Sequence, residues 1–178
     1  EIWFLLALVR DLRMTGDYDK AQACVEQARP IVARLGIATD HFQLEVGASA
    51  LLLDQERYAE CKTLLDPLLP EMEERAAKEP DDLDTRRTLG NACRIYGAVQ
   101  GVLGDVADAI RLYRKAQKLY DEAGDRRGQG RVLDQMATLY LQMQQFDAAE
   151  RASLQAVEQA EALGDASLES AFRVGLSN

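Results

Sequence analysis

The stretch GDYDKA at residues 16–21 returns three times along the chain, as ERYAEC (56–61), GDVADA (104–109) and QQFDAA (144–149). The first positions of successive copies are 40, 48 and 40 residues apart. A sequence period of about 20–50 residues indicates a stack of similar structural units. The pattern therefore predicts a repeat protein.

Each copy combines a turn with the start of a helix. The glycines Gly16 and Gly104 can end a preceding helix in the left-handed conformation. Two positions later comes an apolar side chain, which we expect to wedge between the helices of a hairpin. Three positions further comes a small residue, which lets the two helix axes approach. The apolar residues are Tyr18, Tyr58, Val106 and Phe146, and the small ones are Ala21, Cys61, Ala109 and Ala149.

Helical periodicity precedes every turn. Before the last turn, Leu133, Met136 and Tyr140 follow one another at spacings of three and four residues. Such spacings mark a helix with one buried face. Each unit is therefore predicted to be a helical hairpin that completes its core by packing on its neighbours.

In these features the chain resembles the tetratricopeptide repeat family, in its longer variety of roughly 40 residues. The second helices close with the comparable phrases ARLGIATD (33–40), YDEAGDRRG (120–128) and AEALGDASL (160–168). The resemblance implies an all-α fold, a right-handed α-solenoid of stacked helical hairpins. The expected units are residues 1–40, 41–82, 83–125 and 126–165, followed by a partial fifth unit or capping helix over 166–178.

The second unit carries the irregular segment LLDPLLPEMEERAAKEPDD (64–82), which contains Pro67, Pro70 and Pro80. Proline inside a helix removes a hydrogen bond and disturbs the preceding turn. Pro30 and Pro70 stand at the same offset from their turns, so we expect a bend in both second helices. We also expect an extended helix ending near Glu79, a loop at 80–82 and a long helix over 83–103. The Pro67–Pro80 insertion is either neutral or an edge that contacts another domain.

Composition limits the classes of partner. The chain has 178 residues, 47% hydrophobic, with a net charge of −9 and a pI near 4.7. This charge disfavours direct binding of nucleic acid or of anionic membranes. Three cysteines, Cys24, Cys61 and Cys93, form no metal-binding motif. We expect them to be buried and reduced, which suits a cytoplasmic location.

The apolar opening EIWFLLALV (1–9) is shorter than the ~20 residues that span a bilayer. It has neither the basic leader nor the cleavage site of a signal peptide. We interpret the chain as a fragment of a longer protein whose first helix is covered by an upstream repeat or by self-association. The candidate association surface comprises Ile2, Trp3, Phe4 and Leu6.

Catalytic patterns are sparse, and an enzyme is not expected. The single histidine, His41, stands beside Asp40 at the start of a first helix, where a polar cap is expected, and we assign it a structural or solvent-exposed role. The segment GDRRGQGR (124–131) lacks the order of a phosphate loop and is interpreted as a connector. Its alternative role is capture of an anion at the next helix start by Arg126, Arg127 and Arg131. No cofactor or metal is expected.

The resemblance implies that the first helices line a concave groove that binds protein or peptide. Residues of those helices outside the buried stripes are the candidate contacts: Trp3, Arg10, Arg13, Gln43, Asp54, Asn91, Arg94, Arg131, Asp134, Gln135 and Thr138. This set differs from the lysine and asparagine clamp of the chaperone-binding members.

The expected function is therefore a non-catalytic binding scaffold or sensor module within a larger, transcription-regulatory protein. Two alternatives stay open. One is a structural spacer or homo-oligomerisation module that uses the N-terminal helix, and the other is a small-molecule sensor domain.

Overall fold

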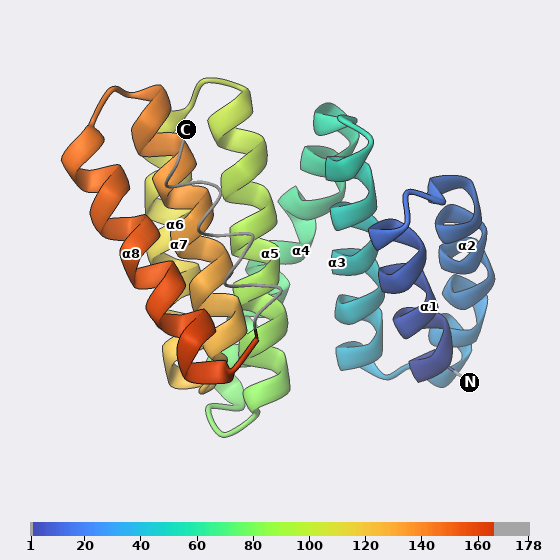
Figure 1. Ribbon diagram of the computed structural model, residues 1–178. Helices are drawn as coiled ribbons and strands as arrows, with labels where there is room; N and C mark the ends of the chain where they lie inside the picture. Colours follow the sequence, from blue (N-terminus) through green and yellow to red (C-terminus); the bar gives the residue numbers. More distant parts are fainter. Residues whose placement is uncertain (1, 166–178) are drawn as a thin grey trace. The chain divides into compact units, whose positions relative to one another are not determined.

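The computed structural model describes residues 2–165, which form helices and no strand. The chain divides into two compact units, with the boundary between Thr88 and Leu89. The helices are α1 (Ile2–Met14), α2 (Tyr18–Leu35), α3 (Ala38–Asp54), α4 (Tyr58–Lys78), α5 (Leu83–Val102), α6 (Val106–Glu122), α7 (Arg126–Gln142) and α8 (Phe146–Leu163) (Figure 1). The predicted all-α helical-repeat fold is confirmed. The predicted fifth hairpin lies outside the described residues.

The repeated turns share one backbone conformation. Gly16, Glu56, Gly104 and Gln144, the first residues of the four sequence copies, have φ angles of 78°, 58°, 91° and 59°. A positive φ is rare for residues other than glycine. The turn geometry is thus kept in the two copies that lack glycine.

The small residues of the pattern are buried as predicted. Ala21, Cys61 and Ala109 are fully buried, and Ala149 is 2% exposed. The expectation for the apolar residue is wrong in the last copy, because Phe146 is 65% exposed and does not wedge between helices. A small side chain lets two helices pack closely. These four positions therefore set how closely the second helix of each hairpin approaches the first.

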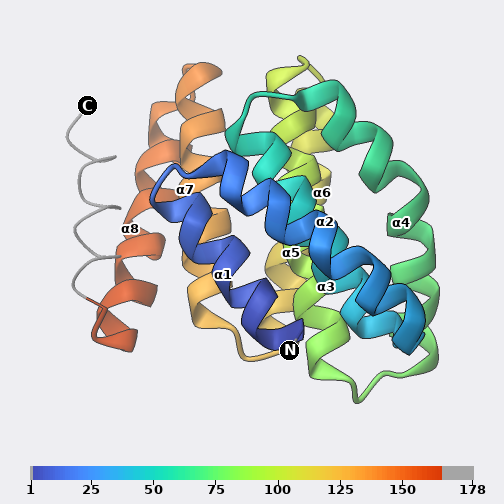
Figure 2. The same ribbon diagram turned by 90° about the vertical axis from the view of Figure 1, so that its right-hand side faces the viewer.

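In the first unit, α1 packs against α2 and α3, and α3 packs against α4 (Figures 1 and 2). Their common core includes Ile2, Val9, Val25 and Leu44. Arg29 of α2 donates two hydrogen bonds to the Glu45 carboxylate of α3, each 3.0 Å long. Glu45 is itself buried, so this bidentate pair satisfies a charge inside the interface between α2 and α3.

The proline-containing segment forms a helix for most of its length. α4 runs through the exposed Pro67 and Pro70 to Lys78, and α5 begins at Leu83, which confirms the predicted helix ends and the loop. Asp82 caps α5 by accepting hydrogen bonds from the Thr85 hydroxyl (2.6 Å) and backbone N–H (3.0 Å). These hydrogen bonds lower the pKa of Asp82. The predicted bends at Pro30 and Pro70 stay a prediction.

In the second unit, α7 packs against both α6 and α8. Leu133 of α7 meets Ala156, Val157 and Ala160 of α8 in one core cluster. On the side of α5, the ring of Tyr120 lies against Gly90 and Gly128. The helices of this unit therefore hold α5 and α7 at a close approach, which positions the polar residues considered next.

Candidate functional site

Side chains of α5 and α7 converge in the second unit, and six predicted groove residues lie on these two helices. Asn91 and Arg94 are three residues apart on α5, so they share one helical face. Arg131, Asp134, Gln135 and Thr138 follow the same spacing rule on α7. Arg94 joins the two helices by donating from Nη1 to Oε1 of Gln135 over 3.2 Å. We call the set of Asn91, Arg94, Tyr120, Arg131, Asp134 and Gln135 the polar cluster.

Tyr120 of α6 anchors the polar cluster and was not among the predicted site residues. Its hydroxyl donates to Oδ1 of Asn91 at 2.9 Å. Burial raises the pKa of Tyr120, while the nearby charge of Arg94 acts in the opposite direction. The signal in the sequence was indirect: an aromatic residue late in a second helix, with glycines in both neighbouring first helices.

Three charged side chains of the polar cluster have polar atoms without a partner among the described residues. The Nε atom of Arg94 is buried and makes no hydrogen bond. Among the described residues, the Arg131 guanidinium and the Asp134 carboxylate have no hydrogen-bond or ion-pair partner. Polar groups near the interior are normally satisfied. The exposed Arg131 guanidinium and the half-buried Asp134 carboxylate are available to a ligand, whereas the Arg94 Nε is enclosed by the protein.

The electrostatics of these groups follow from partial loss of water. Desolvation lowers the pKa of Arg131, and the positive charges of Arg94 and Arg127 act in the same direction. Desolvation also raises the pKa of Asp134. Both shifts disfavour the charged forms, so an oppositely charged ligand group would relieve an existing cost at either side chain.

A pocket of about 170 Å³ lies along the same two helices. Gln135, which accepts a hydrogen bond from Arg94, also forms part of the wall of this pocket. The remaining lining comes from Ala98, Gly101 and Val102 of α5, Tyr113 of α6, and Thr138, Leu139 and Gln142 of α7. The small α5 residues leave space for a side chain. Charged groups and a small, partly apolar recess are therefore adjacent on one surface, which we call the α5–α7 surface.

The candidates from the first unit are placed differently. Arg13 of α1 and Asp54 of α3 form an ion pair at 2.8 Å, so they satisfy each other instead of presenting free charges. Arg10 pairs with the neighbouring Asp11 on an exposed face. Gln43 is half-buried on α3. Among residues 2–88, the predicted candidates thus do not converge as those of the polar cluster do.

The observed burial of its side chains corrects the predicted association surface. Ile2 is only 5% exposed and belongs to the core, and Leu6 is half-buried against it. Trp3 and Phe4 are 66% and 70% exposed. Residues three to four apart share a helical face, so Ile2, Leu6 and Val9 turn inward together and the two aromatic residues between them turn outward.

The observed helix starts correct two expected positions, although the exposed His41 keeps the solvent-facing role expected for it. His41 does not cap a helix, because α3 already begins at Ala38; it is exposed and its ring lies 5.9 Å from that of Phe42. The GDRRGQGR segment is not a connector, because α7 begins at Arg126. The Asp125 carboxylate accepts from Gly128 N–H (2.9 Å), so the start of α7 already has an anion. Arg127 pairs with Asp165.

The cysteines are buried as predicted. Burial raises the pKa of Cys61 to about 12, so its thiol is held in the unreactive protonated form. Within residues 2–165, no group of His, Cys, Asp and Glu side chains is arranged to hold a metal ion.

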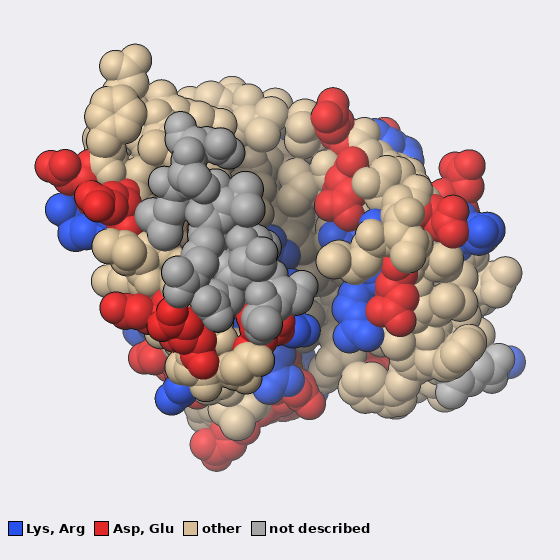
Figure 3. Space-filling view, in the orientation of Figure 1, with Lys and Arg blue, Asp and Glu red and all other residues tan. Residues whose placement is uncertain are grey.

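Acidic and basic side chains are interspersed on the face drawn in Figure 3. None of the helices in the described part of the chain is long and apolar enough to cross a membrane.

Comparison with known proteins supports the repeat interpretation. A family model described as tetratricopeptide repeat matches residues 95–162. The match covers the end of α5, all of α6 and α7, and most of α8, and so includes most of the polar cluster. No curated protein matches the chain.

Proposed function

We propose that the chain is a non-catalytic protein- or peptide-binding module and that the α5–α7 surface is its binding site. Tetratricopeptide repeats generally mediate protein–protein interaction. The observation that carries the proposal is the convergence of Arg94, Arg131 and Asp134 beside a small pocket, with Arg131 and Asp134 unpaired among the described residues. A peptide supplies both carboxylates and amino or guanidinium groups, which match the two signs of charge.

The mechanism would use charge-assisted hydrogen bonds for orientation and the pocket for selectivity. A ligand carboxylate would pair with the exposed guanidinium of Arg131, since guanidinium groups bind carboxylates in a defined planar geometry. A ligand cation would pair with Asp134. A neighbouring ligand side chain would enter the recess beside Thr138. The regulatory setting inferred from the family resemblance belongs to the same proposal: binding would bias an attached effector domain, in a cytoplasmic protein.

The test compares how strongly the wild-type protein and a double variant bind the same partner. Partners captured with the wild-type protein are measured against Arg94→Ala/Arg131→Ala, with Arg34→Ala as a matched control, because Arg34 is exposed on α2. We expect the double variant to lose at least tenfold in affinity while the control keeps the wild-type value. Equal affinity of all three folded proteins would show that the α5–α7 surface is not the binding site.

A homo-oligomerisation module is the second candidate, favoured by the exposed Trp3 and Phe4. Two adjacent exposed aromatic residues on one helix are consistent with an association surface. Trp3→Glu should convert a concentration-dependent dimer into a monomer in sedimentation experiments. A monomer at all concentrations in both proteins would remove this candidate.

A further inference from the structure

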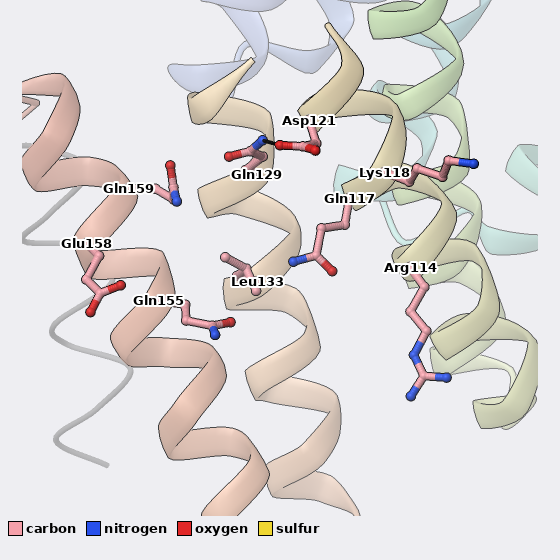
Figure 4. A pocket seen from close by; sticks show the side chains of 9 residues that line it. All are labelled: Arg114, Gln117, Lys118, Asp121, Gln129, Leu133, Gln155, Glu158 and Gln159. Carbon is pink, nitrogen blue, oxygen red and sulfur yellow. Dashed lines mark hydrogen bonds between the residues drawn. The ribbon is translucent and has the colours of Figure 1, made fainter. Parts of the chain in front are cut away.

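A second and larger pocket, of about 530 Å³, lies in the second unit among α6, α7 and α8 (Figure 4). Leu133 of α7 lies at its centre, with Gln117 of α6 and Gln155 of α8 extending toward it from either side (Figure 4). Gln129 and Gln159 complete a set of four amide side chains. The volume falls in the usual range for ligand sites, about 300–1,000 Å³.

The first unit shows that such a space can be closed by side chains of the same chain. Counted from the repeated turns, Gln117 and Leu133 correspond to Arg29 and Glu45. There, Arg29 spans the interface and binds both oxygens of Glu45, with Glu26 as a further partner at 3.0 Å. Replacement of this ion pair by glutamine and leucine leaves no side chain that bridges α6 to α7 at these positions.

The polar lining indicates what could occupy the pocket. Gln129 donates to Asp121 over 3.2 Å, but Gln117, Gln155 and Gln159 have no hydrogen-bond partner in the described part of the chain. Each glutamine amide offers a donor and an acceptor together. A peptide group presents the same two functions. The walls therefore carry the hydrogen-bonding groups that an extended peptide backbone requires, above an apolar floor at Leu133.

The charges around the pocket argue against an anionic ligand such as a phosphate. Arg114 and Lys118 are balanced by Asp121 and Glu158, so the lining has no net charge. α6 carries charges of both signs, Arg114, Lys118 and Asp121, and α8 contributes Glu158. This distribution suits a neutral backbone with side chains or ends of opposite charge.

We propose that the pocket lined by Gln117, Gln155, Gln159 and Leu133 binds an extended peptide segment through its backbone amides, at a site separate from the α5–α7 surface. Recognition would depend on the glutamine amides and would tolerate many peptide sequences, because the backbone groups are common to all of them.

The test uses a defined probe, the blocked peptide acetyl-tetraalanine amide, titrated into the ¹⁵N-labelled protein. We expect saturable shifts of the side-chain amide resonances of Gln117, Gln155 and Gln159. Gln117→Ala/Gln155→Ala should abolish saturation at Gln159, while Gln27→Ala, an exposed change on α2, should leave it unchanged. Alanine favours helix, so the double variant should stay folded.

A second variant reproduces the closure found in the first unit. Gln117→Arg/Leu133→Glu should build the bridging ion pair across the pocket and prevent binding, provided that circular dichroism shows an unchanged helix content. Arg94→Ala/Arg131→Ala should bind the probe normally, which separates this proposal from the proposed function.

Three results would overturn the proposal. The first is the absence of amide shifts in the wild-type protein up to the solubility limit of the peptide. The second is saturation that persists in Gln117→Ala/Gln155→Ala. The third is equal shifts with glucose as the probe, since this would assign the amides to hydroxyl ligands in general.

Discussion

Tyr120 packs its ring directly on the backbone of Gly128, so closely that a Cβ atom at Gly128 would lie 2.5 Å from the ring carbon Cδ1. The contact needs a residue without a side chain on α7 and a fully buried aromatic residue on α6. Because the Tyr120 hydroxyl also binds Asn91, this contact sets the position of α7 relative to the polar residues of α5.

We expect Gly128→Ala to destabilise the protein by about 1–3 kcal/mol, because the ring of Tyr120 must move in a packed interior. Gly47→Ala is the matched control: a Cβ there would meet no atom within 4 Å, and Gly47 lies inside α3. Alanine is the better helix former, so the control should gain about 0.5–1 kcal/mol. Urea unfolding followed by circular dichroism measures both. Equal effects of the two changes would contradict the packing assigned to Tyr120.

Ala109→Trp tests the close contact between α5 and α6. Ala109 is fully buried, and a Cβ at Gly101 of α5 would lie 3.7 Å from its own Cβ. An indole at this position should cost roughly 1–3 kcal/mol through overpacking. Ala107→Trp, an exposed position of the same helix, should change the melting temperature little. A wild-type melting curve for Ala109→Trp would place the close contact elsewhere.

Glu56→Gly should stabilise the turn between α3 and α4. Glu56 has φ 58°, a left-handed conformation that costs other residues about 1–2 kcal/mol relative to glycine. Part of this gain is offset by the larger entropy of glycine in the unfolded chain, so we expect about 1 kcal/mol in chemical denaturation. The neighbouring Arg57 has φ −86°, so Arg57→Gly should bring no gain. A loss of stability in Glu56→Gly would mean that its side chain contributes more than the backbone conformation costs.

Asp134→Asn should make the protein more stable at neutral pH, because burial raises the pKa of the Asp134 carboxyl. A carboxyl whose pKa is higher in the folded state binds its proton more tightly there. Its destabilising effect is absent at pH values well below the unfolded pKa of about 3.9 and is complete above the folded pKa. The difference in unfolding free energy between wild type and variant should therefore grow as the pH rises through this interval. A constant difference from pH 3 to pH 7 would show that the carboxylate bears no desolvation cost.

Much of the fold was predictable because local spacing carries it. The repeated turn and the small residue five positions later, such as Ala21 or Cys61, specify where each second helix begins and where it approaches its partner. The same periodicity placed the groove candidates of α5 and α7 on their helices. Burial of Ile2 beside exposed Trp3 was not predicted, because an almost wholly apolar helix start does not indicate which of its faces meets the core.

The sequence by itself determined the succession of helices, the turns between them and the small contact positions, since each depends on residues only a few places apart. The tertiary structure alone decided which polar groups are satisfied. Arg13 finds Asp54 and Arg94 finds Gln135 across 41 residues of chain in each case, and Arg29 closes an interface that Gln117 leaves open. Pairing of this kind depends on the distance between side chains of different helices, which is fixed only when the helices pack.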